Sequence, residues 1–376
     1  MAYLRRFLST VFALLGTIAA LNALIDPFDL LGAPVFAGIN QVKAPGNDRF
    51  FKPIAVELDQ PRTVFVGTSR VVVGLDPHDL PGENAYNLGL LGSATAEHIA
   101  FARYAIAHAP VERLIIGLDF ASFVSRTEFS PSFKLAILGR FVFWRALPEM
   151  LISQSALLQS RVAFTQSRRR AKPRYAADGM LLAANEPSDG STPTQRILRK
   201  VDEYARFYHW APGPEAALAE FDAFLAQIPP RVAVFAYVTP AHAALSEALS
   251  PSGLGPVYDL WLRRVTAICA EHHVPLWDFN GYNRVTTVPF ATSGEDFIDG
   301  AHTTPAIGRL VLDTLLRGAT VPDFGVRLTP DMLPAYLETQ HTAAQAWRRD
   351  HPEDASLAAE TAFHSAAQEA ARGSGL

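Results

Sequence analysis

The stretch "TVFVGTSRVVVG", Thr63 to Gly74, places an apolar, β-branched run directly before a glycine and a serine. A short run of this kind, without polar alternation, is typical of a strand that is buried on both faces. The turn after it puts Ser69 just past the carboxyl end of that strand. Because open α/β sheets bind ligands beyond the carboxyl ends of their strands, Ser69 is a candidate site residue.

Three further runs repeat the pattern of this first strand, which we expect over Thr63 to Gly67. They are "RLIIGLDF" (113–120), "RVAVFAYVTP" (231–240) and "VPLWDF" (274–279). Helix-like stretches lie between or beside them, at 95–109, 214–228 and 257–273. Apolar strands that alternate with helices indicate an α/β fold, here a three-layer sandwich with a central parallel sheet.

The N-terminus predicts a membrane anchor. Arg5 and Arg6 precede an uncharged run of 19 residues, Phe7 to Ile25. At about 1.5 Å per residue a helix of this length nearly spans a hydrocarbon core of roughly 30 Å. The arginines predict an inside N-terminus and an outside domain. A cleaved signal peptide is the competing interpretation, but the run is long and no small-x-small site closes it. A buried soluble helix is disfavoured because no face of the run is strongly polar.

The composition changes along the chain predict five parts. We expect an anchor at 1–28, a Pro-, Gly- and Asn-rich linker at 29–60, and the α/β domain at 61–325. A helical insertion of about 124–208 lies between the second and third predicted strands. The Ala-, Glu- and Gln-rich tail, 326–376, is predicted to form an exposed helical appendage.

Charge and cysteine content exclude several classes of protein. The formal net charge of −4 argues against a nucleic-acid partner. The single cysteine, Cys269, excludes an intramolecular disulfide and a multi-cysteine metal site. The basic run Arg168 to Arg174 is interpreted as a solvated loop, with contact to an anionic polymer or to lipid headgroups as the alternative. No phosphate loop, dinucleotide pattern or metal-ligand spacing is present, so we expect no cofactor and no metal.

A second stretch, "DFIDGAHTTPAIG" from Asp296 to Gly308, supplies a carboxylate and an imidazole three positions apart. A histidine oriented by a carboxylate is the base half of many acyl-transfer sites, although the pair also occurs in ordinary polar turns. Asp299 and His302 can share one turn, which favours Asp299 as the partner. Asp278, at the end of the fourth predicted strand, is the alternative.

The context of Ser69 differs from the nucleophile elbow G-x-S-x-G, because Val71 occupies the last glycine position. A serine at a strand-to-helix turn is also a common helix N-cap. A Gly-rich loop, "YNLGLLGSAT", follows and includes Gly92. Such loops present free backbone N–H groups, which can hold the oxyanion of a tetrahedral intermediate.

Four short blocks, "GTSR", "NLGLLGS", "GLDF" and "DGAH", occur in the order of the SGNH (GDSL-like) hydrolase superfamily, which the region Pro61 to Leu316 resembles. The resemblance implies that Ser69 is the nucleophile, His302 the general base and Asp299 the carboxylate that orients it. It further implies that the backbone N–H groups of Ser69 and Gly92 bind the oxyanion.

The anchor that runs into "NALIDPF", followed by "VGTSRVVVGLDP", resembles membrane-anchored SGNH proteins of cell-envelope acylation. These include the alginate O-acetyltransferase group and the D-alanyl transfer proteins of teichoic acid synthesis. The resemblance implies a single-pass inner-membrane protein with its catalytic domain in the periplasm. It also implies a multi-spanning O-acyltransferase partner, because an outward domain has no cytosolic acyl donor.

One block departs from the superfamily. Where SGNH enzymes place an asparagine, "GLDF" has Asp119, and an ionised carboxylate would repel an oxyanion. Asp119 either pairs with Arg70, which follows Ser69, or caps the segment after it. His242 follows the third predicted strand and is a candidate for positioning substrate, with a polar loop residue as the alternative.

Together these features predict a membrane-anchored, serine-dependent O-acyl transferase, most simply an O-acetyltransferase, that acts on an envelope or exported polysaccharide. Two alternatives remain open at this point. One is a periplasmic carbohydrate esterase or deacetylase with the same triad. The other is a non-catalytic SGNH-like scaffold that binds polysaccharide.

Overall fold

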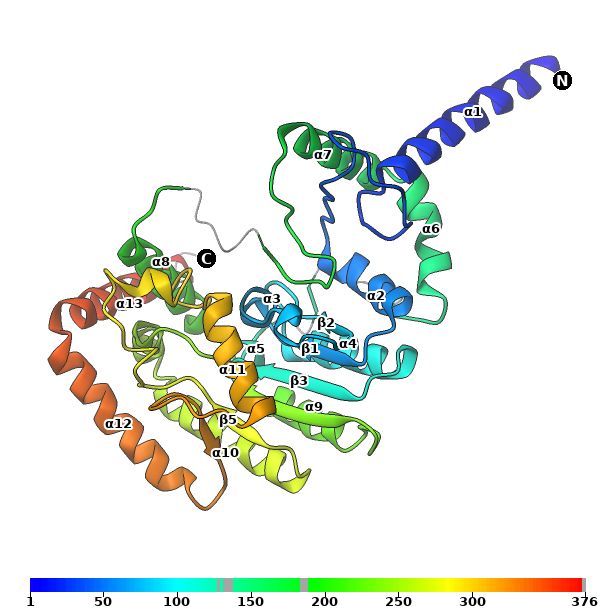
Figure 1. Cartoon of the computed structure of the whole chain (residues 1–376). Coiled ribbons are helices and arrows are strands. Elements are labelled where there is room, and N and C mark those ends of the chain that lie inside the picture. The colour runs from blue at the N-terminus through cyan, green and yellow to red at the C-terminus, as the bar shows by residue number, and fades with distance from the viewer. Residues whose placement is uncertain (127–128, 131–137, 183–188, 374–376) are drawn as a thin grey trace.

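The computed structural model describes residues 1–126, 129–130, 138–182 and 189–373 and is an α/β protein with a six-stranded sheet (Figure 1). The strand order is β2-β1-β3-β4-β5-β6. All neighbouring strands are parallel except β5 and β6, which are antiparallel. The strands are β1 (Thr63–Val66), β2 (Ala85–Asn87), β3 (Arg113–Leu118), β4 (Ala233–Val238), β5 (Leu276–Asp278) and β6 (Val326–Leu328).

Helices connect these strands. In the described residues the α-helices are α1 (Ala2–Ile25), α2 (Asp48–Asp59), α3 (Ser69–Gly74), α4 (Thr95–His108), α5 (Phe120–Phe123), α6 (Val142–Ile152), α7 (Gln154–Arg169), α8 (Pro193–His209), α9 (Glu215–Leu225), α10 (Gly255–Glu271), α11 (Pro305–Arg317), α12 (Leu333–Asp350) and α13 (Pro352–Gly373). The 3₁₀ segments are η1 (Pro77–Asp79), η4 (Ala243–Ser252) and η5 (Ser293–Glu295).

Both faces of the sheet are buried, as the apolar strand sequences require. Val64 and Val66 of β1 belong to one hydrophobic cluster, which also contains side chains of α4, α9 and α10. Phe65, which points to the other face, belongs to a second cluster with side chains of α3 and α11. Successive strand residues alternate between the two clusters, so helices cover the sheet on both sides.

The four predicted strands are present as β1, β3, β4 and β5, and two strands were not predicted. These two, β2 and β6, have three residues each, which is too short for a hydrophobic period to be recognised. Because β6 runs antiparallel to β5, the sheet is mostly rather than wholly parallel.

The second half of the predicted linker 29–60 is the buried helix α2. The Asn47 side chain accepts a hydrogen bond from the N–H of Arg49 and thereby caps its first turn. Phe50, Phe51 and Ile54 then join the main hydrophobic cluster. An N-cap followed by apolar residues at helical spacing is the local signal that the Pro and Gly content obscured.

The described part of the predicted insertion forms α6, α7 and α8, with irregular chain between α7 and α8. Residues 127–128, 131–137 and 183–188 of the predicted insertion lie outside the described residues. The tail differs from the exposed appendage that the sequence predicted. It begins with β6, and α13 packs against α8 and η4. Ala358 and Ala362 of α13 are fully buried in that contact.

Helix α1 is apolar, with a mean hydropathy of 2.0 in its most apolar 18-residue window, and projects away from the sheet (Figure 1). It is consistent with a signal sequence or a single membrane anchor. Most of α1 is exposed, and only Asn22 and Ile25, near its end, are buried. At that end it contacts α6 and α7.

Candidate active site

The site lies where the chain changes direction across the sheet. Strand β1 lies between β2, at the edge of the sheet, and β3. The chain passes from β1 outward to β2 and then back across β1 to β3, so the strand order reverses beside β1. Such a switch point is the usual ligand crevice of a parallel α/β sheet. Ser69 is the first residue of α3, two positions after Gly67, whose φ of 152° no side chain readily adopts. A Cβ at Gly67 would collide with Val71.

Ser69, His302 and Asp299 form one hydrogen-bonded chain. The Oγ atom of Ser69 lies 2.8 Å from Nε2 of His302, although the two residues are 233 positions apart in the sequence. On the other side of the ring, Nδ1 of His302 lies 2.9 Å from Oδ1 and 3.0 Å from Oδ2 of Asp299. With the proton on Nδ1, the Nε2 lone pair faces the serine hydroxyl and is placed to accept its proton.

Hydrogen bonds within the turn hold Asp299 in place beside His302. One carboxylate oxygen of Asp299 also accepts hydrogen bonds from the backbone N–H groups of Ala301, at 2.8 Å, and His302, at 2.9 Å. Burial alone would raise the pKa of the Asp299 carboxyl, but the hydrogen bond and charge of His302 outweigh it and lower the pKa to about 2. The carboxylate is therefore ionised at neutral pH and stabilises an imidazolium beside it.

Close backbone packing brings the histidine turn to the serine. Helix α11 begins two residues after Thr303, and its Gly308 lies against the backbone of Gly74 at the end of α3. A Cβ at Gly308 would collide with the carbonyl oxygen of Gly74, so only glycine permits this approach. A Cβ at Gly74 would in turn lie 3.0 Å from Oγ1 of Thr303. Two glycines thus set the distance between the segments that carry Ser69 and His302.

Asp119 has both of the roles considered for it. Its Oδ1 accepts a hydrogen bond from the N–H of Ala121 and caps α5, and its Oδ2 accepts one from Oγ1 of Thr68 at 3.1 Å. The same Oδ2 lies 3.2 Å from Nε of Arg70, and both side chains are buried. Burial disfavours the charged guanidinium, but the charge of Asp119 raises the pKa of Arg70 overall. The negative charge beside the site is therefore balanced by Arg70, which also donates to the Tyr204 hydroxyl at 3.1 Å.

Two backbone N–H groups are available to an oxyanion. Neither Ser69 nor Gly92 has a hydrogen-bond partner for its N–H group among the described residues, and both residues line the same cavity. The loop that carries Gly92 is held from α2. Lys52 donates to the carbonyl oxygens of Asn87, at 2.8 Å, and Gly89, at 2.6 Å. The segment predicted as a linker thus supports the loop that carries Gly92.

Arg49, also on α2, binds the same loop further along the chain. Its guanidinium pairs with Glu97 at 2.8 Å and donates to the carbonyl oxygen of Leu91 at 2.9 Å. Asp48 accepts from the N–H of Leu91 at 2.8 Å. These three charged side chains are buried and mutually paired, which fixes the loop without leaving a charge uncompensated.

A cavity of about 350 Å³ opens beside Ser69 and falls within the size range of small-molecule sites. Its lining combines Ser69 and His302 with further hydroxyls, a Lys–Glu pair and two aromatic rings: Thr68, Ser69, Gly92, Ser93, Asp119, Ala121, Ser122, Ser125, Lys200, Glu203, Tyr204, Phe207 and His302. The four residues from α8 were not predicted. The capping box at Thr192 and Gln195 marks that helix in the sequence, but nothing local shows which cavity it lines.

The remaining candidates lie outside this cavity. His242 is buried, and both of its ring nitrogens are hydrogen-bonded. Nε2 donates to the Val288 carbonyl at 2.8 Å, and Nδ1 accepts from the Ala244 N–H at 3.2 Å. Burial lowers the pKa of His242 to about 4, so it caps η4 as a neutral ring. Asp278 accepts from the Tyr336 hydroxyl at 3.1 Å instead of contacting His302, so the structure pairs His302 with Asp299.

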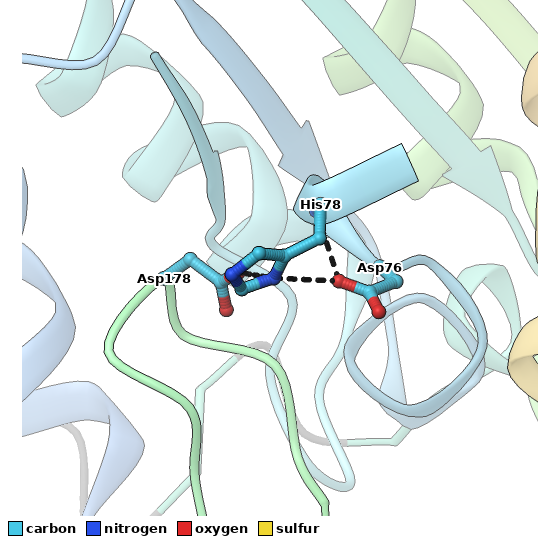
Figure 2. A group of neighbouring side chains, drawn as sticks. All are labelled: Asp76, His78 and Asp178. Atoms are coloured by element: carbon cyan, nitrogen blue, oxygen red, sulfur yellow. Dashed lines mark hydrogen bonds and ion pairs between the residues drawn. The ribbon is translucent and has the colours of Figure 1, made fainter. Parts of the chain in front are cut away.

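Asp76, His78 and Asp178 bring three potential metal-ligand atoms together in the described part of the chain (Figure 2). Nδ1 of His78 lies 3.1 Å from Asp76 and 2.7 Å from Asp178. The hydrogen bond with Asp76 and the charge of Asp178 raise the pKa of His78. An exposed imidazolium between two carboxylates accounts for this arrangement, and we assign no metal to it.

Comparison of the chain with known family models and with curated proteins finds no match. The functional argument therefore depends on the geometry of the site and on the physical chemistry of its residues.

Proposed function

We propose that this chain is a membrane-anchored serine acyltransferase of SGNH type that transfers an acyl group, most simply acetyl, to a hydroxyl of an envelope or exported polysaccharide. The observation that carries the proposal is the hydrogen-bonded chain from Ser69 through His302 to Asp299 at the carboxyl end of β1. Helices on both sides of the sheet support the three-layer sandwich that this superfamily shares.

The geometry supports a two-step acyl transfer. The Ser69 oxygen attacks the carbonyl carbon of a donor ester while Nε2 of His302 takes the hydroxyl proton. The tetrahedral oxyanion is held by the N–H groups of Ser69 and Gly92. When the ester C–O bond breaks, His302 returns the proton to the leaving alcohol. An acceptor hydroxyl then attacks the acyl-serine, His302 takes that proton, and Ser69 recovers it.

The lining of the cavity supports a carbohydrate acceptor. Ser122 contributes a hydroxyl, Lys200 and Glu203 contribute a charged pair with a 2.6 Å contact, and Phe207 presents a partly exposed ring. Hydroxyl and charged groups match the hydroxyls of a sugar, and an aromatic face packs against its C–H surface. Asp119 is paired with Arg70 and Glu203 with Lys200, so the charges of the lining do not require a charged small-molecule substrate.

The contacts of α1 support an anchor that stays attached. Asn22 is fully buried and hydrogen-bonds to two residues of the insertion, Leu151 and Ser160. Asp26, also buried, accepts from the N–H groups of Leu30 and Leu31. Cleavage at the end of α1 would remove groups that the folded domain needs, whereas an uncleaved helix keeps them.

The test is covalent labelling of the full chain in detergent with a serine-reactive fluorophosphonate probe. We expect labelling of the wild type and a loss of about 10³-fold or more in Ser69→Ala and His302→Ala, because the serine is activated only by the imidazole. His272→Ala is the matched control, since His272 pairs with Asp222 at 2.7 Å but has no role here. A folded wild type that does not label would overturn the proposal.

Transfer and hydrolysis are separated by the fate of the acyl group. We supply p-nitrophenyl acetate as the acyl donor and a short glycan as the acceptor. If the cavity binds the glycan, we expect more acetylated glycan than free acetate. Free acetate alone, unaffected by glycan, would favour the carbohydrate esterase. If the Ser69→Ala variant does not label but still restores polymer acetylation in a deletion strain, the result would favour the non-catalytic scaffold.

A further inference from the structure

Helix α7 buries small side chains and exposes large apolar ones, which is the reverse of what is expected for a helix on the surface of a water-soluble domain. Its buried stripe consists of small residues at helical spacing: Ala156, Ser160, Ala163 and Ser167. Its exposed surface includes large apolar side chains: Leu157, Leu158, Val162 and Phe164. A soluble surface helix buries its large apolar face, so α7 has the inverse pattern.

The small-residue stripe is fixed against α1 and the chain that follows it. Oγ of Ser160 donates to the Asn22 side chain at 2.7 Å, and Oγ of Ser167 accepts from the N–H of Val42 at 2.9 Å. Ala163 packs in a small cluster with Ile25. Since these contacts determine the rotation of α7 about its axis, the apolar side chains are held outward by the fold.

The same contacts give the depth of α7 relative to the apolar helix. Asn22 stands three positions before Ile25, the last residue of α1, which corresponds to about 4.5 Å along the helix. In a membrane-spanning α1 the middle of α7 therefore lies within one turn of the boundary between hydrocarbon and headgroups. Interfacial amphipathic helices bury their apolar face to about 5–10 Å at this boundary.

Two segments that lie at the foot of α1, the loop after it and helix α6 (Figure 1), add exposed apolar side chains. Phe36 and Ile39 lie in the loop that Asn40 ties to α1, through a 2.8 Å hydrogen bond from its amide to the Leu24 carbonyl. Trp144 of α6, which contacts α1, is 66% exposed. Tryptophan is enriched where an apolar and an aqueous phase meet.

The charge at the end of α7 matches a lipid surface. Exposed arginines at 168, 169 and 170 close the helix, and Lys172 and Arg174 follow. The Arg168 guanidinium lies 6.0 Å from the Phe164 ring centroid, so the basic group adjoins the apolar side chains. Lysine and arginine beside an apolar interfacial helix bind the phosphates of anionic phospholipids.

We propose that α7 lies in the lipid interface beside α1, with its outward apolar side chains among the acyl chains and Arg168 to Arg174 on the phosphates of anionic phospholipids. The inference requires α1 to stay in the membrane, but it is independent of acyl transfer. It assigns the insertion a definite role, since a second contact with the bilayer stops the domain from pivoting about a single helix.

The test uses the full chain in liposomes with an environment-sensitive fluorophore on one introduced cysteine. Cys269 is buried, and Cys269→Ala removes it from the reaction. We compare Leu158→Cys with Leu357→Cys of α13, whose native leucines are 52% and 43% exposed. In vesicles of phosphatidylcholine and phosphatidylglycerol, we expect a blue-shifted emission at 158, quenching by nitroxide lipids and several-fold less quenching by iodide than at 357.

Because the arginines bind anionic headgroups, we expect the protection at 158 to be weaker in vesicles of phosphatidylcholine alone. Replacement of Arg168, Arg169 and Arg170 by glutamine should remove this difference between the two kinds of vesicle. Equal iodide quenching at 158 and 357 in both kinds of vesicle would overturn the proposal. Protection at 158 only in native membranes would also overturn it and would indicate a membrane-protein partner. Fluorophosphonate labelling of the same samples tests acyl transfer separately, so a failure of the lipid contact of α7 can be distinguished from a failure of the proposed acyl transfer.

Discussion

At the scale of single residues, the most informative departure from an SGNH-like site is the buried pair of Arg70 and Asp119. An SGNH-type site of the kind proposed above has an asparagine donor at this position, whereas here both oxygens of Asp119 are occupied, by Thr68, Ala121 and Arg70. In the acyl transfer proposed above, the oxyanion therefore has backbone N–H donors alone. One missing donor typically costs about 10²–10³ in rate, which suits a slow transferase better than an efficient general hydrolase.

The pair predicts a large effect of a small substitution. Asp119→Asn should lower the free energy of unfolding by about 3 kcal/mol, because it leaves the buried Arg70 guanidinium without its counter-charge. Urea unfolding of the full chain in detergent, followed by tryptophan fluorescence, measures this change.

Glu112→Gln is the control for that measurement. It removes one partner of the exposed Arg62–Glu112 ion pair and should change the free energy of unfolding by less than about 1 kcal/mol. Similar losses in both variants would show that the Arg70–Asp119 pair is no more desolvated than a surface pair.

At the scale of elements, the contact between α3 and α11 determines whether the triad forms. Helix α3 begins with Ser69, and α11 begins shortly after His302. Their backbones meet at Gly74 of α3 and Gly308 of α11. A methyl group at Gly308 would collide with the Gly74 carbonyl, so the spacing of the segments that carry Ser69 and His302 depends on the absence of a side chain there.

Gly308→Ala should therefore slow the labelling of Ser69 by about 10–100-fold, since a displacement near 1 Å is costly in a catalytic geometry. Gly255→Ala, at the start of α10, is the matched control because nothing lies within 4 Å of the added methyl group. Labelling rates with the fluorophosphonate probe report both. A wild-type rate in Gly308→Ala would mean that α11 moves without displacing His302.

At the scale of the whole molecule, Lys52 couples the stability of the fold to pH. Its side chain is fully buried, and burial lowers its pKa to about 7 against the opposing charges of Asp48 and Asp178. In the unfolded chain the lysine has its ordinary pKa near 10.5. Between these two values the unfolded chain binds a proton that the folded chain does not.

The free energy of unfolding should consequently rise with pH between about 7 and 9.5, by up to about 1.4 kcal/mol per pH unit from this group. Below pH 7 both states bind the proton and the contribution of Lys52 to the slope disappears. Lys52→Met should flatten the slope in urea titrations across this range. Lys172→Met, an exposed lysine, should leave it intact. An unchanged slope in Lys52→Met would contradict the neutral buried amine.

Local sequence patterns determined the parts of this protein that depend on residues close together in the chain. The apolar runs at β1, β3, β4 and β5 and the helical periods at α4, α9 and α10 predicted those elements, and the uncharged run predicted α1. The spacing of Asp299 and His302 predicted a shared turn, which the structure contains. Patterns of this kind depend only on the order of neighbouring residues: a continuous apolar run for a strand buried on both faces, and a short spacing for two side chains that share a turn.

Tertiary structure alone decided what depends on distant residues. The meeting of Ser69 with His302 across 233 positions, the support of the Gly92 loop by α2, and the cavity lining from α8 follow from how helices pack on the sheet. So do the short strands β2 and β6, which form by pairing with β1 and β5. Three-residue strands and inter-helix glycine contacts carry too little local free energy to leave a pattern in the sequence, and they exist only because the packed sheet stabilises them.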